Sequence, residues 1–171
     1  MALLELPVLG PTEFKTSRYQ TGSWCVEFPL HDEYVSVNFY ADGPEMTGTL
    51  LLRVEKFLAH LGDFDRLART VIREDYASGE GATSRRFLSY NLENFSPAVR
   101  RACFGTDDVS SIGAEHLLAA LNPLQVALNP EAGDTKSVAV FDYILGSGIS
   151  DQILCIGFNA QGEAGPLYWD S

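Results

Sequence analysis

The chain has 171 residues, of which 46% are hydrophobic and 20% charged, and its 12 Lys/Arg against 23 Asp/Glu give a net charge of −11. Length and composition predict a single domain spanning residues 1–171 with its own core, and they exclude a chain that is disordered throughout. Because this charge opposes unspecific attraction to nucleic acid and to anionic lipid, we expect neither as a partner.

Two segments near the N-terminus, 24–28 and 34–40, alternate apolar and polar residues and are rich in β-branched and aromatic types. This period of two is typical of half-buried strands. The polar loop 29–33 between them predicts an antiparallel hairpin. The core-facing side chains would be Trp24, Val26, Phe28, Val35, Val37 and Phe39.

From Leu50 onward the hydrophobic spacing changes to three and four, which is typical of helices. It predicts one helix that ends at Gly62, a second that Asp63 caps and that breaks at 78–81, and a third along 87–95. In the second helix, the apolar side chains expected to face the core are Phe64, Leu67, Ala68, Val71 and Ile72. Those expected to face solvent are Asp65, Arg66, Arg69 and Arg73.

Two shorter helices follow in the pattern. Ser96-Pro97 is an N-cap with proline in the first turn, and Gly105 is a typical stop for the run 98–104. Residues 114–121 predict a last helix, closed by Asn122-Pro123.

The remaining sequence predicts a meander of strands at 124–128, 137–145, 152–158 and 167–169. Strands at both ends with helices between them indicate an α+β fold. We therefore expect an antiparallel sheet, built from the N-terminal hairpin and the C-terminal meander, with four or five helices from the middle of the chain on one face.

Three cysteines, Cys25, Cys103 and Cys155, are widely spaced and have apolar neighbours, so we expect buried free thiols. That usage favours a reducing compartment. The N-terminus has no basic leader, and no apolar stretch approaches the ~20 residues of a membrane helix. The sequence therefore predicts a cytoplasmic protein.

Patterns that carry catalysis or cofactor binding are missing from the sequence. It has no phosphate-binding glycine motif and no Gly-x-Ser-x-Gly elbow, and Gly146–Ser150 is expected to be a turn. The three histidines, His31, His60 and His116, fall in different elements, which opposes a metal site. We predict no catalytic residue, no cofactor and no metal.

One acid, Asp142, interrupts the most apolar strand of the chain, 138–145. Since an unpaired buried carboxylate costs several kcal/mol, it either lies near water on an outward or edge position or is buried with a partner. We favour the outward or edge position near water. The other possibility is that Asp142 has a binding or catalytic role. Asp151 follows Ser150 before the next strand and is expected in a turn.

Not all of the tyrosines and tryptophans fit into the core by alternation. Such side chains are enriched where partners dock. The group comprises Tyr40, Tyr90, Tyr143, Tyr168 and Trp169. The tail 166–171 is either an available edge strand or a segment that folds back to cap the core, and we favour capping.

The segments 141–145 and 150–159, with Gly162-Glu163 after them, resemble the closing motif of a bacterial domain-of-unknown-function family. That family has a Phe-Asp-Tyr strand, then Ser/Thr-Asp and a second apolar strand; residues 114–129 are also similar. The resemblance covers about the last third of the chain and implies a fold but no activity. Asn91 stands where the family pattern has a histidine, so no metal or acid–base site is implied.

Negative charge is concentrated towards the C-terminus: residues 102–171 contain Lys136 alone against nine acids, whereas 53–101 contain nine basic and seven acidic residues. We therefore hypothesise a non-catalytic protein-binding module, for example an immunity-type or adaptor protein, whose acidic face attracts a basic partner. A homodimer through a free sheet edge is a related hypothesis. The alternative is an enzyme or small-ligand-binding protein with a helix/sheet pocket around Asp142, Tyr143, Asp151 and His116.

Overall fold

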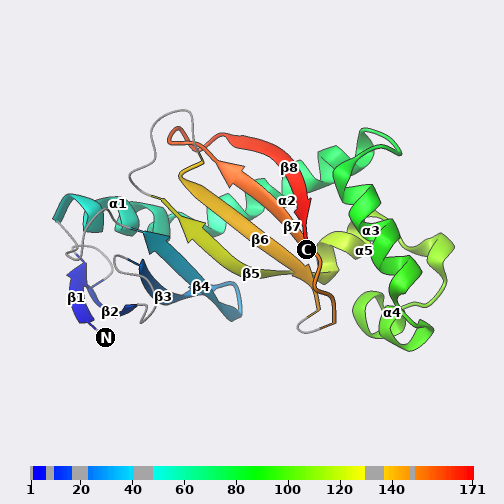
Figure 1. Ribbon diagram of the computed structural model, residues 1–171, viewed down its shortest axis with the longest axis horizontal. Coiled ribbons are helices and arrows are strands. Elements are labelled where there is room, and N and C mark those ends of the chain that lie inside the picture. The colour runs from blue at the N-terminus through cyan, green and yellow to red at the C-terminus, as the bar shows by residue number, and fades with distance from the viewer. Residues whose placement is uncertain (1, 7–9, 17–22, 41–47, 130–136, 147–148) are drawn as a thin grey trace.

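The computed structural model describes residues 2–6, 10–16, 23–40, 48–129, 137–146 and 149–171 (Figure 1). Those residues form eight strands and five α-helices. The strands are β1 (Ala2–Leu6), β2 (Gly10–Thr16), β3 (Ser23–Leu30), β4 (Glu33–Tyr40), β5 (Leu121–Leu128), β6 (Ala139–Leu145), β7 (Ile153–Phe158) and β8 (Ala164–Asp170). The helices are α1 (Gly48–Ala59), α2 (Leu61–Ala77), α3 (Thr83–Asn94), α4 (Pro97–Phe104) and α5 (Ala114–Ala120).

The strands lie in chain order, β1 to β8, and all neighbours are antiparallel except β4 and β5. All five helices fall between β4 and β5 in the sequence, so the chain returns to run beside β4 in the same direction. The predicted α+β class, the N-terminal hairpin and the C-terminal meander are confirmed. The sheet is mixed because of that one parallel pair, and β1 and β2 extend it beyond the prediction.

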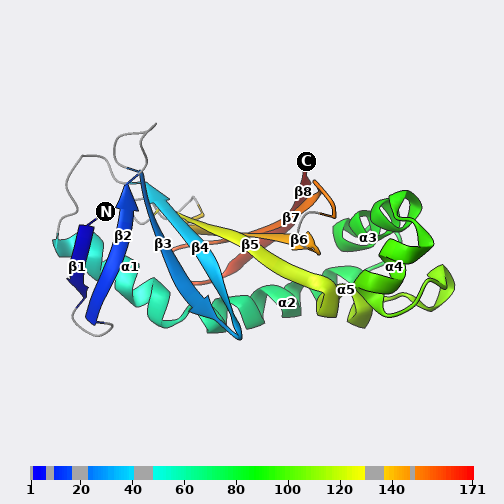
Figure 2. The ribbon, with the colours of Figure 1, turned by 90° about the horizontal axis from the view of Figure 1, so that it is seen from below.

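The helices divide into two groups. Figure 2 shows α1 and α2 along one face of the sheet and α3 to α5 gathered at one end of it. The helix α2 buries Leu61, Ala68 and Ile72, with Val71 partly buried against the core. Leu67, predicted to face the core, is 39% exposed. The predicted placement of the helices on one face is clearest for α1 and α2, which lie along the sheet (Figure 2).

The core lies between this helical layer and the inner face of the sheet. The hairpin contributes the side chains that its alternation predicts, among them Val37 and Phe39, both fully buried. Phe141 and Phe158 meet edge to face with centroids 5.6 Å apart, and Phe57 of α1 packs on Phe141. Such pairs add about 1 kcal/mol each beyond the area they bury.

Helix boundaries follow local chemistry at some places and not at others. The Ser96 side chain accepts from the amide of Val99, and Gly105 has φ 73°, so α4 begins and ends as predicted. In contrast, α1 and α2 meet at His60, and α5 runs directly into β5. Pro123 therefore lies inside β5. Only the later residues Gln125–Leu128 of this strand pair with β4, so the N–H that Pro123 lacks is not needed for that ladder.

All three cysteines are free; Cys155 is buried as predicted, whereas Cys25 and Cys103 are only partly buried. Among the described residues, no helix combines the length and the apolar character needed to cross a membrane.

Candidate functional site

The sheet face opposite α1 and α2, here called the outer face, carries a row of polar side chains across six strands. Consecutive pairings place these side chains in one line. They are Glu27, Ser36, Gln125, Asp142, Cys155 and Tyr168. Among the described residues no helix covers this face (Figure 2). Glu27 and Tyr168 are exposed, Ser36, Gln125 and Asp142 are partly buried, and Cys155 is buried between its neighbours.

Hydrogen bonds connect the middle of the row. The Gln125 side chain donates from Nε2 to Oδ2 of Asp142 (2.9 Å) and accepts at Oε1 from Asn38 Nδ2 (3.2 Å). Asp142 is only partly buried. It points away from the helices, because its neighbours Phe141 and Tyr143 are buried on the opposite face. The favoured sequence interpretation, an outward position near water, thus describes Asp142, which lies on a central strand rather than an edge strand.

The other end of the row has weakly acidic groups. Burial, together with the nearby Asp142, raises the pKa of Cys155 to about 12. Partial burial and the neighbouring Cys155 and Asp142 raise the pKa of Tyr168 to about 12 as well. Both side chains are therefore protonated at neutral pH, and the Cys155 thiol is a poor nucleophile.

The strand layer is anionic. Strands β3 to β8 contain no lysine or arginine, and among the described strand residues the only cation is Lys15 on β2. The described residues of 23–40 and of 121–171 contain seven acids: Glu27, Asp32, Glu33, Asp142, Asp151, Glu163 and Asp170. Of these, Glu27, Asp142 and Asp170 share the outer face.

The helical layer neutralises part of the C-terminal acidity. Glu115 pairs with Arg73 (2.9 Å), and Asp107 pairs with Arg101. Glu131 and Asp134 lie outside the described residues. Among the described residues, the other acids of 102–171 are Asp108 after α4 and four that lie on the strands or in their connections: Asp142, Asp151, Glu163 and Asp170.

The predicted site residues do not converge. Tyr143 is fully buried and points to the helices, so the expectation that groups it with exposed aromatics is wrong. His116 lies on α5, its Nδ1 3.4 Å from the Gly113 amide, and Asp151 is exposed in the β6–β7 connection. Asp142 lines neither the cavity beside α1 nor the cavity between α4 and α5. A pocket formed by Asp142, Tyr143, Asp151 and His116 is therefore absent from the described part of the chain.

The C-terminal strand combines both predicted alternatives. Strand β8 is the last of the sheet, and Tyr168 is 46% exposed on its outer face. On its inner face, the Trp169 ring packs edge to face on Phe87 and Tyr90 of α3, with centroids 6.1 and 5.1 Å apart. The tail is an edge strand whose tryptophan caps the core.

A buried carboxylate that periodicity places on the solvent side joins three elements. Asp65 of α2 is fully buried. Two hydrogen bonds compensate for the burial of its charge: the Tyr143 hydroxyl donates to Oδ1 (2.8 Å), and Arg69 Nε donates to Oδ2 (2.9 Å). His31 Nε2, in the β3–β4 turn, lies 2.8 Å from the same Oδ2. Burial opposes ionisation of Asp65, but these partners outweigh it and lower its pKa.

His31 adopts a backbone conformation that ordinarily favours glycine, with φ 56°. A non-glycine residue at such a position costs about 1 kcal/mol. The contact with Asp65 offsets that cost and fixes the hairpin on α2. The side chain of His31 is half exposed.

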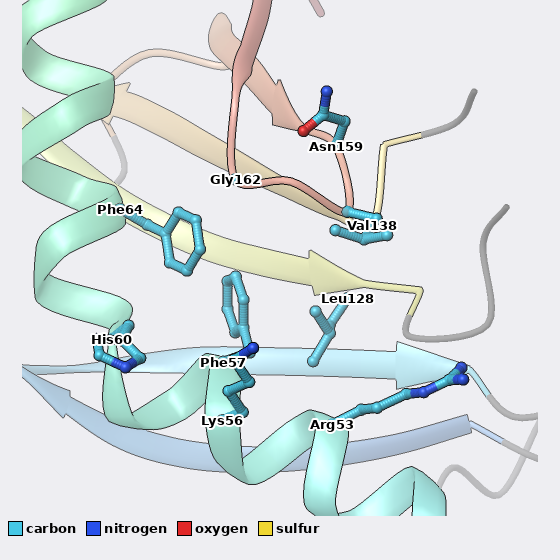
Figure 3. A pocket seen from close by; sticks show the side chains of 10 residues that line it. Arg53, Lys56, Phe57, His60, Phe64, Leu128, Val138, Asn159 and Gly162 are labelled. Carbon is cyan, nitrogen blue, oxygen red and sulfur yellow. The ribbon is translucent and has the colours of Figure 1, made fainter. Parts of the chain in front are cut away.

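A cavity of about 410 Å³ lies at the other end of the helical layer, between α1, the adjoining ends of β5 and β6, and the β7–β8 turn (Figure 3). We call it the α1 pocket. Its lining is Arg53, Lys56, Phe57, His60, Phe64, Leu128, Val138, Asn159, Ala160 and Gly162. The sequence pattern gave no signal for it, because these residues belong to four separate segments.

Within the described residues, no group of three or more His, Cys, Asp or Glu is arranged to hold a metal ion. No family model, curated protein or solved structure matches the chain. The resemblance to a domain-of-unknown-function family therefore stays a prediction.

Proposed function

We propose that this protein is a cytosolic, non-catalytic protein-binding module, of the immunity or adaptor kind, whose outer sheet face binds a basic protein. The observation that carries the proposal is the polar row from Glu27 to Tyr168 on a face without lysine or arginine between β3 and β8. A tyrosine that is 46% exposed lies within the row beside two carboxylates, and tyrosine is enriched in protein interfaces.

The charge distribution gives this face a kinetic role. A surface of one sign attracts a partner of the opposite sign before contact and raises its association rate, and salt screens this effect. Arginine fits best, because its guanidinium forms paired hydrogen bonds with carboxylates such as Asp142. The partner is therefore expected to present arginines on a flat or convex surface.

The chemistry of the row supports binding over catalysis. Asp142 already accepts from Gln125, and the Cys155 thiol, with a pKa of about 12, is protonated at neutral pH. The Asp142 carboxylate beside Cys155 raises the pKa of the thiol, so it does not activate it as a nucleophile.

The test uses two matched triple variants in a pull-down from lysate. The outer-face variant is Glu27→Gln, Asp142→Asn, Asp170→Asn. The control, Glu74→Gln, Glu80→Gln, Glu93→Gln, removes the same charge from exposed positions on α2, in the α2–α3 turn and on α3. We expect the wild type and the control to capture one basic protein, and the outer-face variant to lose it. Capture should fall at about 0.5 M salt, where the Debye length is only ~4 Å.

Equal capture by the outer-face variant would refute the proposal. Light scattering of the protein alone distinguishes a second copy from a foreign partner. Dimerisation that persists in the outer-face variant would assign self-association to another surface, such as the β8 edge.

A further inference from the structure

We propose that the α1 pocket binds a small organic anion, namely a carboxylate, sulfonate or phosphate ester attached to a flat apolar body. The site is separate from the outer face, since none of its lining residues belongs to the row Glu27–Tyr168. The inference is therefore independent of the proposed function.

Two basic side chains of α1 and one at its junction with α2 line the pocket. Arg53 and Lys56 lie three residues apart on α1, and His60 follows four residues after Lys56. Figure 3 shows the side chain of Arg53 extending away from α1 and that of Lys56 close to Phe57. The described lining contains no carboxylate, although the chain carries a net charge of −11. His60 contacts the carboxylate of Asp63, which lies outside the lining (3.1 Å). The positive charge of the lining therefore comes from Arg53 and Lys56, and it favours an anion.

The interior of the pocket is aromatic. The rings of Phe57 and Phe64 stack with centroids 4.9 Å apart and planes at 21°, and both point into the space beside α1 (Figure 3). Phe64 is only partly buried. A Cβ on Gly162 would lie 3.6 Å from the Phe64 ring, so the glycine leaves the edge of that ring uncovered. A flat apolar ligand can contact the surface that remains open.

The volume identifies the size of ligand. About 410 Å³ is within the range of small-molecule sites. An inorganic ion alone would fill only a small part of this space. The wall formed by Leu128 and Val138 offers such an ion no polar side-chain group, so we infer an anion with an organic body.

The test compares two fluorescent probes that share their aromatic rings and differ in charge: anilinonaphthalene sulfonate and the neutral phenylnaphthylamine. We expect the sulfonate to bind with one site per chain and the neutral probe to bind at least about tenfold more weakly, since it gains no charge pairing. Lys56→Gln should weaken sulfonate binding about threefold and Lys56→Glu about tenfold, while neither changes binding of the neutral probe.

Two further variants locate the binding. Arg86→Gln removes an exposed cation from α3, outside the pocket, and should leave binding of the sulfonate unchanged. Val138→Phe fills the pocket from its wall and should abolish binding of both probes. The backbone groups of Val138, which bond to Asn129 and Phe158, do not depend on its side chain.

Competition then identifies the headgroup. Displacement of the sulfonate probe by benzoate or by phenyl phosphate supports the proposal and names the preferred anion. The proposal is overturned if benzyl alcohol competes equally well, if Lys56→Glu binds like wild type, or if Val138→Phe, folded by circular dichroism, retains the site.

Discussion

The buried carboxylate Asp65 provides the sharpest test of how the layers are held together. Its two oxygens accept from Tyr143, Arg69 and His31, which lie on β6, on α2 and in the β3–β4 turn. The substitution Asp65→Asn preserves shape but replaces one acceptor oxygen by an amide donor. Whichever way the amide turns, at least one of these partners then faces a donor instead of an acceptor.

The size of the effect follows from the burial of this group. Removing one partner of a buried ion pair costs about 3–5 kcal/mol, and a hydrogen bond to a charged group contributes about 1.5–3 kcal/mol. Arg69 retains the carbonyls of Leu118 and Leu121 and is 25% exposed, so its charge is not stranded. We therefore expect Asp65→Asn to destabilise the protein by about 3 kcal/mol at pH 7.

Urea unfolding followed by tryptophan fluorescence measures this difference. The control is Asp63→Asn, the same chemical change at an exposed site of α2, which should leave the urea midpoint nearly unchanged.

The dependence of stability on pH provides a second measurement. The folded-state pKa of Asp65 is below its ordinary value of 3.8, so its contribution is complete above that value and is lost as pH falls through the folded pKa.

The asparagine variant has no such titration at residue 65. The gap in stability between the two proteins should therefore narrow below about pH 4. A difference under about 0.5 kcal/mol at pH 7, or a gap that does not change with acid, would refute the assignment of Asp65 as the charged centre that joins the layers.

Three further predictions follow from single contacts. Tyr143→Phe removes one buried donor to Asp65 and should cost about 1–2 kcal/mol in the same urea assay, less than Asp65→Asn. Gly105→Ala forces a side chain onto φ 73° at the end of α4, and thermal unfolding should show a loss of about 1 kcal/mol. Cys155 should resist iodoacetamide at pH 8 until urea exposes it, because its pKa of about 12 leaves only ~1 thiolate in 10⁴; rapid labelling of the native protein would contradict this.

Segments with strong local signals could be predicted from the sequence. Ser96-Pro97 and Gly105 bound α4 because capping depends only on neighbouring backbone groups. The β3–β4 hairpin and the meander follow from alternation, which the burial of Val37 and Phe39 confirms. Such features need no information about distant residues.

Features that depend on distant partners could not be predicted. Periodicity places Asp65 towards solvent, but Tyr143 and Arg69 make burial of its charge favourable, and those contacts are invisible in the local pattern. The parallel pairing of β4 with β5 depends on where the helices return the chain. The α1 pocket likewise joins side chains from separate segments, from Arg53 to Gly162.

The junction between β4 and β5 also sets an order for folding. The hairpin β3–β4 and the meander β5–β8 are each closed by short connections, so each forms at a small entropic cost. The ladder from Ser36–Gln125 to Phe39–Leu128 spans the whole helical region, and loop closure must precede it. The two halves of the sheet are therefore expected to join late, after the helices have brought them together, and the seam between them is where a partly folded chain would first come apart.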